Sequence, residues 1–316
     1  MRRPAANCVR LRALVTTDPT VAPEAPRVPS SGARLGLAAA AGLAALAILE
    51  TAQALVAPSR APTPADWAAL AGEVHRGFRT GDLIVAAPAW ADPVMRQYLG
   101  DVLTIPAAAR MDDARYGRVW EVGEHGAHAA EARGTATLTR HFGALTLRLL
   151  ERPAASVTYD FLERWTDARV TRWTPATQRL EACPWQGDRF VCPSGGGAHR
   201  ELVEVDTRIR RAVMVPPVAG SILAVEFPAA LLGREMVLAA GLHDVWARKL
   251  GRGTVNVEVW LDGQPVRSVT IGNRSGWLPV HIDTTARDGQ TASVRVQISA
   301  PDPTLRYLAF AAEARR

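Results

Sequence analysis

The sequence lacks the motifs that mark the common enzyme families. It has no G-x-S-x-G turn that would expose a serine nucleophile, and no serine or cysteine has a recognisable base partner. The glycine cluster at Ser194–Gly197 has neither a buried strand before it nor a helix after it, and a phosphate-binding loop needs both. The sequence therefore assigns no catalytic residue and no cofactor.

Cysteine is scarce, with only Cys8, Cys183 and Cys192 in the chain. Two cysteines without a nearby second pair of ligands do not make a zinc site, so no metal is predicted there. Cys183 and Cys192 frame a short segment whose turn, Gln186–Asp188, can bring two strands and both thiols into register. We predict a Cys183–Cys192 disulfide, and a pair of unpaired buried thiols is the alternative.

A strong excess of one charge is missing from most of the chain. Residues 1–34 hold six arginines and two acidic residues, whereas the chain after residue 57 has 31 basic and 28 acidic residues. Nucleic-acid binding needs a strong basic excess on one face, so no nucleic-acid partner is predicted. The basic character of the protein belongs to its N-terminal arm.

Long apolar runs are also missing, with one exception. Leu35–Leu49 contains no polar side chain, and the segment 35–57 is long enough to cross a hydrocarbon core of ~30 Å. Because the arginines precede it, the positive-inside rule places the N-terminus in the cytoplasm. We expect a single-pass inner-membrane protein with its bulk in the periplasm. The alternatives are a signal peptide cleaved after Ala54 and a buried helix of a soluble protein.

The patterns divide the chain into four parts: a flexible arm (1–34), a membrane anchor (35–57), a small α/β domain (58–152) and a β-sandwich (153–316). In the third part, Thr63 and Pro64 begin an amphipathic helix, and the apolar run 83–87 predicts a buried strand. A helix is expected from Asp92 to Gly100. The further predicted elements are strand 102–105, helix 106–115, strand 117–122 and strand 144–150. This succession predicts a Rossmann-like domain with a parallel sheet.

From residue 156 onward the apolar residues recur with a period of two. The clearest signal is a pair of alternating runs, 255–261 and 266–271, joined by Asp262-Gly263, a strong hairpin signal. Other predicted strands are 157–161, 201–206, 208–215, 221–227, 278–282, 294–298 and 306–312. Many short strands with frequent turns predict an antiparallel sandwich of the jelly-roll type. The fold class is therefore α+β.

Two segments carry resemblances to known families. The stretch from Gly81 to Leu99 resembles the extracytoplasmic α/β segment of polyprenyl-phosphate-dependent membrane glycosyltransferases, but this chain has one candidate membrane helix where those enzymes have many. Residues 241–246 and 257–277 resemble galactose-binding-like jelly rolls. Together they resemble exported bacterial proteins, which implies a fold and no activity.

Aromatic residues provide the strongest functional signal. Sugars stack on aromatic rings while planar polar groups bind their hydroxyls. The sandwich holds three tryptophans, Trp246, Trp260 and Trp277, beside polar residues. The candidate ligand-binding set is His243, Asp244, Trp246, Asn273, Arg274 and Trp277. Trp260 alternates out of register with Val257 and Val259, so it faces away from them. The alternative is that these tryptophans are core or interface residues.

A second candidate site follows the strand 83–87, where α/β sheets usually bind ligands. Trp90 and Asp92 lie there and can hold a sugar or a nucleotide, although packing and helix capping are alternative roles. His125 and His128, near Glu124 and His141, have a spacing that suits a metal pair, but surface histidines are favoured and no metal is predicted. The acidic pair at positions 112 and 113 is interpreted as solvent-exposed charge rather than as a catalytic pair.

These observations support three hypotheses. The first is a non-enzymatic, membrane-anchored envelope protein whose sandwich binds glycan or supports a protein complex. The second is an envelope enzyme acting on glycan or a lipid-linked sugar near Trp90 and Asp92. The third is a structural module without a small ligand. The expected partners are the membrane and either a glycan or an envelope protein.

Overall fold

The structure, a computed structural model, describes residues 31–243 and 253–316. The chain forms two compact units, Met1–Ala61 and Pro62–Arg316. Outside the described residues lie the first 30 residues of the predicted arm, which include Cys8, and two members of the candidate sugar-binding set, Asp244 and Trp246. The domain boundary predicted at residue 152 falls inside the second unit and stays a prediction.

The described part of the first unit is one apolar helix, α1 (Ser31–Arg60), of 30 residues. Its segment Leu35–Gln53 has a mean hydropathy of 1.8 and is the only stretch of the described chain long and apolar enough to span a membrane. Side chains such as Leu35 and Ile48 are 76% and 70% exposed. Length and composition suit both a membrane span and a signal sequence.

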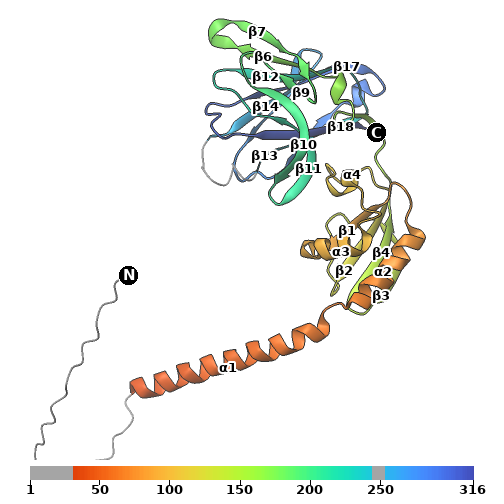
Figure 1. Ribbon diagram of the computed structural model, residues 1–316, viewed down its shortest axis with the longest axis vertical. Coiled ribbons are helices and arrows are strands. Elements are labelled where there is room, and N and C mark those ends of the chain that lie inside the picture. Colours follow the sequence, from red (N-terminus) through yellow and green to blue (C-terminus); the bar gives the residue numbers. More distant parts are fainter. Residues whose placement is uncertain (1–30, 244–252) are drawn as a thin grey trace, which may run out of the picture. The chain divides into compact units, whose positions relative to one another are not determined.

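The second unit begins with a four-stranded sheet and short helices, which lie below the sandwich in Figure 1. The strand order is β1-β2-β4-β3. β1 pairs with β2 in parallel, while β2, β4 and β3 pair antiparallel. The elements are α2 (Pro64–Gly77), β1 (Leu83–Ala87), η1 (Ala89–Ala91), α3 (Asp92–Leu99), α4 (Ile105–Ala108), β2 (Arg118–Glu124), β3 (Thr135–Phe142) and β4 (Leu145–Glu151).

Three predictions for this part are wrong. The sheet is mixed rather than parallel, because residues 135–151 form a β3–β4 hairpin instead of a further β-α-β crossover. The predicted strand 102–105 is absent because the amides of Val102 and Leu103 bond to the carbonyl of Leu99 at the end of α3. The Thr104 hydroxyl then caps α4, which ends at Ala108, well short of the predicted residue 115.

The helix α2 forms as its sequence predicts. Thr63 and Asp66 make a reciprocal capping box, which satisfies two free amides of the first turn. Trp67, Leu70 and Val74 are buried on the face toward the sheet. The Trp67 ring also stacks on Tyr98 of α3 with the centroids 5.9 Å apart, so the two helices share one core with the sheet.

The rest of the second unit is an antiparallel β-sandwich, as predicted. An eight-stranded sheet has the order β16-β13-β18-β11-β10-β9-β8, with β5 on β18, and a six-stranded sheet has the order β15-β14-β17-β12-β6-β7. Their inner faces share one apolar core. The strands are β5 (Val157–Asp160), β6 (Arg169–Thr174), β7 (Arg179–Cys183), β8 (Trp185–Gln186), β9 (Arg189–Val191), β10 (Gly197–Val205), β11 (Arg208–Val215), β12 (Ile222–Leu231), β13 (Glu235–Leu242), β14 (Val255–Leu261), β15 (Gln264–Ile271), β16 (Leu278–Asp283), β17 (Thr291–Ser299) and β18 (Leu308–Arg315). Three 3₁₀ turns, η2 (Trp165–Asp167), η3 (Pro175–Thr177) and η4 (Thr285–Arg287), connect some of them.

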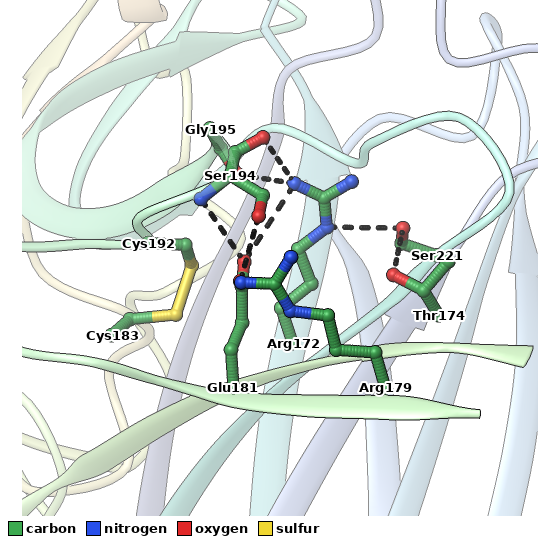
Figure 2. The surroundings of a disulfide bond; sticks show 9 residues. All are labelled: Arg172, Thr174, Arg179, Glu181, Cys183, Cys192, Ser194, Gly195 and Ser221. Atoms are coloured by element: carbon green, nitrogen blue, oxygen red, sulfur yellow. Dashed lines mark hydrogen bonds and ion pairs between the residues drawn. A yellow bond between two sulfur atoms is a disulfide. The ribbon is translucent and has the colours of Figure 1, made fainter. Parts of the chain in front are cut away.

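The predicted disulfide is present and links the end of β7 to the residue after β9. Figure 2 shows how polar contacts hold the loop beside it. Arg172 donates to the carbonyl oxygens of Ser194 and Gly195 at 2.5 and 2.9 Å. Glu181 accepts bonds from the amide and hydroxyl of Ser194. The loop is therefore fixed by a covalent bond and by an arginine–carboxylate network.

Within the second unit, the α/β part packs on the outer face of the eight-stranded sheet. Met111, in the loop after α4, joins a buried cluster with Val237, Ala239 and Ala311. The amide of Arg211 on β11 donates to the carbonyl of Ala109 at 2.9 Å, and Figure 1 shows α4 beside this strand. This contact explains why β13 and β18 are buried along almost their whole length.

Candidate functional site

The outer face of the six-stranded sheet carries a continuous polar surface. On β14, Val255, Val257, Val259 and Leu261 enter the core, so Asn256, Glu258 and Trp260 point outward by strand alternation. Register pairing places these three opposite Ser299, Gln297 and Arg295 of β17 on the same face. The sequence-based prediction that Trp260 faces away from its apolar neighbours is confirmed.

A hollow of about 410 Å³ lies beside Trp260, and its other lining residues are Glu258, Pro265, Val266, Arg267 and Ser268. The register of the β14–β15 hairpin shifts between Val259 and Trp260, and such a bulge redirects the side chains that follow it. The Trp260 indole N–H donates to Glu258 Oε2 at 3.2 Å, which fixes the plane of the ring. The hollow thus has a half-buried aromatic ring beside the Glu258 carboxylate, with Arg267 and Ser268 also among its lining residues.

A second polar group extends this surface across the sheet from Trp260. Arg295 donates to Glu226 Oε2 from Nε and Nη2 at 3.2 and 2.9 Å, and the Ser293 hydroxyl donates to Oε1 at 2.8 Å. Burial alone would raise the pKa of Glu226, but the bonds from Ser293 and Arg295 outweigh it, so its pKa is lowered. Glu226 is therefore ionised and rigidly held at neutral pH.

Trp173 lies at the far end of the same face, where sequence analysis predicted no strand. It pairs with Ile222 across β6 and β12 and is half-buried. In the segment 169–174, Val170 and Trp173 are three residues apart and face opposite sides of the sheet, so no period of two marked this strand in the sequence. The polar face therefore has a tryptophan on β14 and another on β6.

The amino acids that the sequence predicted to bind sugar lie away from this face of the six-stranded sheet. Trp277 precedes β16, its indole N–H donates to the Arg208 carbonyl at 3.0 Å, and the Arg210 guanidinium lies 4.9 Å from its ring centroid. Asn273 accepts a bond from the buried Arg306. The remaining described members, His243 and Arg274, are half-buried and exposed, respectively. The structure does not bring Trp277 together with Trp260, and a sugar-binding role for this set stays a prediction.

Trp90 and Asp92 lie, as expected, after β1. Trp90 is 67% exposed. Asp92 lines a second cavity, of about 430 Å³, and binds Arg96 Nε at 2.5 Å. The other carboxylates of this cavity are also bound by arginines, in the pairs Asp112–Arg315, Asp113–Arg152 and Glu131–Arg110. A general acid must hold a proton near neutral pH, whereas arginine contacts favour the ionised carboxylate, so this arrangement favours binding over acid–base catalysis.

The histidines predicted as a possible metal pair have separate partners. Residues 125–128 form a turn rather than a helix. His125 Nε2 lies 3.4 Å from Glu124, while His128 Nδ1 lies 3.1 Å from the buried Glu121.

The acidic pair at 112 and 113 is not simply solvent-exposed charge, because each carboxylate binds its own arginine.

No family model matches the chain, and no curated protein matches it. The CBM51-2 and INT domains of ZmpB from Clostridium perfringens, in complex with GlcNAc, cover 62% of this chain and 40% of that chain, with 9% identity and a TM-score of 0.34. The CBM51 of a Clostridium perfringens GH95 protein, in complex with methyl-galactose, covers 41% and 90%, with 11% identity and a TM-score of 0.28. A CBM36 module with calcium and xylotriose covers 37% and 88%, with 10% identity and a TM-score of 0.23.

These three structures are of carbohydrate-binding modules. This chain spans less than half the length of the first of them. Because the identities and TM-scores are this low, they assign neither a family nor a ligand to the chain. The resemblance of residues 81–99 to glycosyltransferase segments stays a prediction.

Proposed function

We propose that this chain is a membrane-tethered, non-enzymatic glycan-binding protein of the cell envelope, and that the hollow beside Trp260 holds a sugar. The observation that carries this proposal is the Trp260 ring, fixed by Glu258 and bordered by polar side chains in an open hollow of about 410 Å³. A sugar ring presents C–H groups on its faces and hydroxyls around its edge. An aromatic ring with polar groups at its rim complements both.

The rigidity of the surroundings supports binding at this face. Glu258 and Gln297 are directly opposite each other on adjacent strands, as are Trp260 and Arg295. Arg295 is held in turn by Glu226. Polar groups that are already ordered lose little conformational freedom when a ligand binds. A chain of glycan residues can extend from Trp260 across β17 toward Trp173 on the same face.

The envelope location is supported by two independent features. The segment Leu35–Gln53 has the length and composition of a membrane span, and its side chains are exposed. The Cys183–Cys192 disulfide is typical of proteins in an oxidising compartment. Together with the arginines before the span, they favour an inner-membrane anchor with the N-terminus in the cytoplasm and the second unit in the periplasm.

The experiment that tests glycan binding is a glycan array probed with the full chain, purified in detergent. We expect wild type to bind one class of glycan and Trp260→Ala to lose that signal. The matched control is Trp185→Ala, which removes an exposed tryptophan on the eight-stranded sheet of the sandwich.

Each variant is first compared with wild type by thermal unfolding, so that a lost signal is read only from folded protein. If wild type binds no glycan on the array, the proposed function is wrong. If Trp260→Ala and Trp185→Ala bind as wild type does, the chain binds glycan at another place and the assigned site is wrong.

A further inference from the structure

The cavity at the end of β1 has a composition different from that of the Trp260 hollow. Its volume is about 430 Å³, within the range of small-molecule sites. It is lined by the end of β1 and the start of α3, by the segments 108–113 and 130–133, and by Thr207 with the start of β11 at 208–210. It lies at the carboxyl end of a strand in a parallel pair, where α/β sheets commonly bind ligands.

Every carboxylate that lines this cavity has an arginine partner, but two of the lining arginines have no carboxylate partner among the described residues. Its carboxylates are bound by arginines, as described above, and Arg133 lies 3.7 Å from Asp113. Within residues 31–243 and 253–316, neither Arg208 nor Arg210 has a carboxylate oxygen within the 4.0 Å of a salt bridge. Arg208 and Arg210 therefore line the cavity without an ion-pair partner among the described residues.

The position of Arg210 is fixed by an aromatic contact. Its guanidinium carbon lies 4.9 Å from the Trp277 ring centroid, within the range of a cation–π contact. The Trp277 indole N–H is itself held by the Arg208 carbonyl. Burial lowers the pKa of Arg210 to about 10, and the like charges of Arg208 and Arg110 act in the same direction, against Asp112. Arg210 thus stays cationic at neutral pH although it is half-buried.

We propose that this cavity binds a small organic ligand through an oxyanion group, phosphate or carboxylate, held by Arg208 and Arg210. The planar guanidinium fork donates two parallel hydrogen bonds to such a group, which a lysine cannot do. An anion between the two arginines removes their mutual repulsion. The apolar residues Ile84, Val85 and Ala86 of β1 also line the cavity, and we expect this part of it to contact the uncharged part of the ligand.

The test is isothermal titration of the full chain in detergent with four probes: inorganic phosphate, glucose 6-phosphate, glucuronate and glucose. We expect at least one anion to bind, and Arg210→Gln and Arg208→Gln each to weaken that binding at least tenfold. The two sugar anions separate a phosphate site from a carboxylate site, because they share a ring and differ in the charged group. Glucose reports any binding of the neutral ring.

Two controls keep the result decisive. Arg169→Gln removes an exposed arginine of the six-stranded sheet and should leave anion binding unchanged. Trp260→Ala should also bind the anion as wild type does, so failure of the glycan proposal and failure of this one are distinguishable. Arg208 is exposed, so its replacement leaves the fold intact even if Arg210→Gln unfolds. Absence of binding to every anion, or equal binding by Arg208→Gln, overturns the proposal.

Discussion

At the scale of single residues, Arg315 joins the two parts of the second unit. It donates to both oxygens of Asp112, at 2.8 and 2.9 Å, and to Glu313 at 2.8 Å. Its side chain is 5% exposed and that of Glu313 is 6% exposed. A buried ion pair is costly to break, because the remaining partner is left charged without compensation.

We predict that Arg315→Met lowers the free energy of unfolding by about 3–5 kcal/mol at pH 7, as expected when one partner of a buried pair is removed. Urea unfolding measures this change. The matched control is Arg316→Met, because Arg316 makes an ion pair with Asp288 near the surface. The control should cost no more than about 1 kcal/mol. Equal effects of the two variants would contradict the importance of the buried pair.

The effect of Arg315→Met should also depend on pH. Burial pushes the pKa of Asp112 up, but Arg315 outweighs it, so the folded pKa is below the ordinary value of 3.8. The stabilisation is therefore present above that value and is lost as pH falls through the folded pKa. Burial raises the pKa of Glu313, and Arg315 opposes this rise. In the variant, Glu313 has lost this arginine, so its burial destabilises the fold less once the carboxylate takes up a proton in acid. The difference in free energy of unfolding between wild type and Arg315→Met should therefore become smaller from pH 7 to pH 3. A difference that does not change with pH would contradict this explanation.

Residue-scale contacts were the least predictable from sequence. The acidic pair at 112 and 113 is visible in the sequence, but Arg315 is 203 residues away from Asp112 and only the fold brings them together. Trp260 was different, because alternation on one strand already determined which way it points. Local periodicity thus predicts direction, whereas partners depend on tertiary packing.

At the scale of elements, alternation predicted the strands that have one polar face. The hairpin of β14 and β15 was predicted with its turn, where Asp262 and Gly263 have φ of 46° and 80°. Both values suit a type I′ turn. In contrast, β13 was missed. Its residues from Met236 to Leu242 are all buried, because the core covers one face and the α/β part covers the other, so no polar alternation remains.

We predict that Gly263→Ala lowers the free energy of unfolding by about 1–2 kcal/mol, the cost of a left-handed conformation for an L-residue. No atom lies within 4 Å of the added methyl group, so the cost is conformational and not steric. For Gly72→Ala we predict the opposite sign, an increase in the free energy of unfolding. Gly72 lies in α2 and an added methyl meets only Arg76 at 3.7 Å, so stability should rise by about 0.5–1 kcal/mol. Changes of the same sign in the two variants would contradict this reasoning.

At the scale of the whole molecule, we propose an N-terminal membrane span that precedes a second unit, which binds ligands outside the cytoplasm. The disulfide at Cys183–Cys192 and the apolar helix α1 are independent pointers to this arrangement. The antiparallel sandwich and the helix were predictable from periodicity and composition. The mixed sheet was not, because β4 runs antiparallel to β2 as the second strand of a hairpin with β3, and no strand was predicted at 135–142.

This arrangement predicts which thiols react with a membrane-impermeant maleimide in intact spheroplasts. Cys183 and Cys192 should be labelled only after reduction, because they are bonded to each other. Cys8 precedes the span and should be labelled only after the membrane is permeabilised. A Cys8→Ala variant assigns the labels to their residues. Labelling of Cys8 in intact spheroplasts, or failure to label Cys183 and Cys192 after reduction until the membrane is permeabilised, would contradict the proposed compartment.

The most direct test of glycan binding at Trp260 is isothermal titration with the glycan that wild type binds best on the array. Trp260→Ala should weaken binding at least tenfold, which corresponds to about 1.4 kcal/mol of binding free energy. Trp260→Phe should keep most of the affinity, because a ring remains for stacking although the hydrogen bond to Glu258 is lost. If Trp260→Ala binds that glycan with the affinity of wild type, the central claim is contradicted.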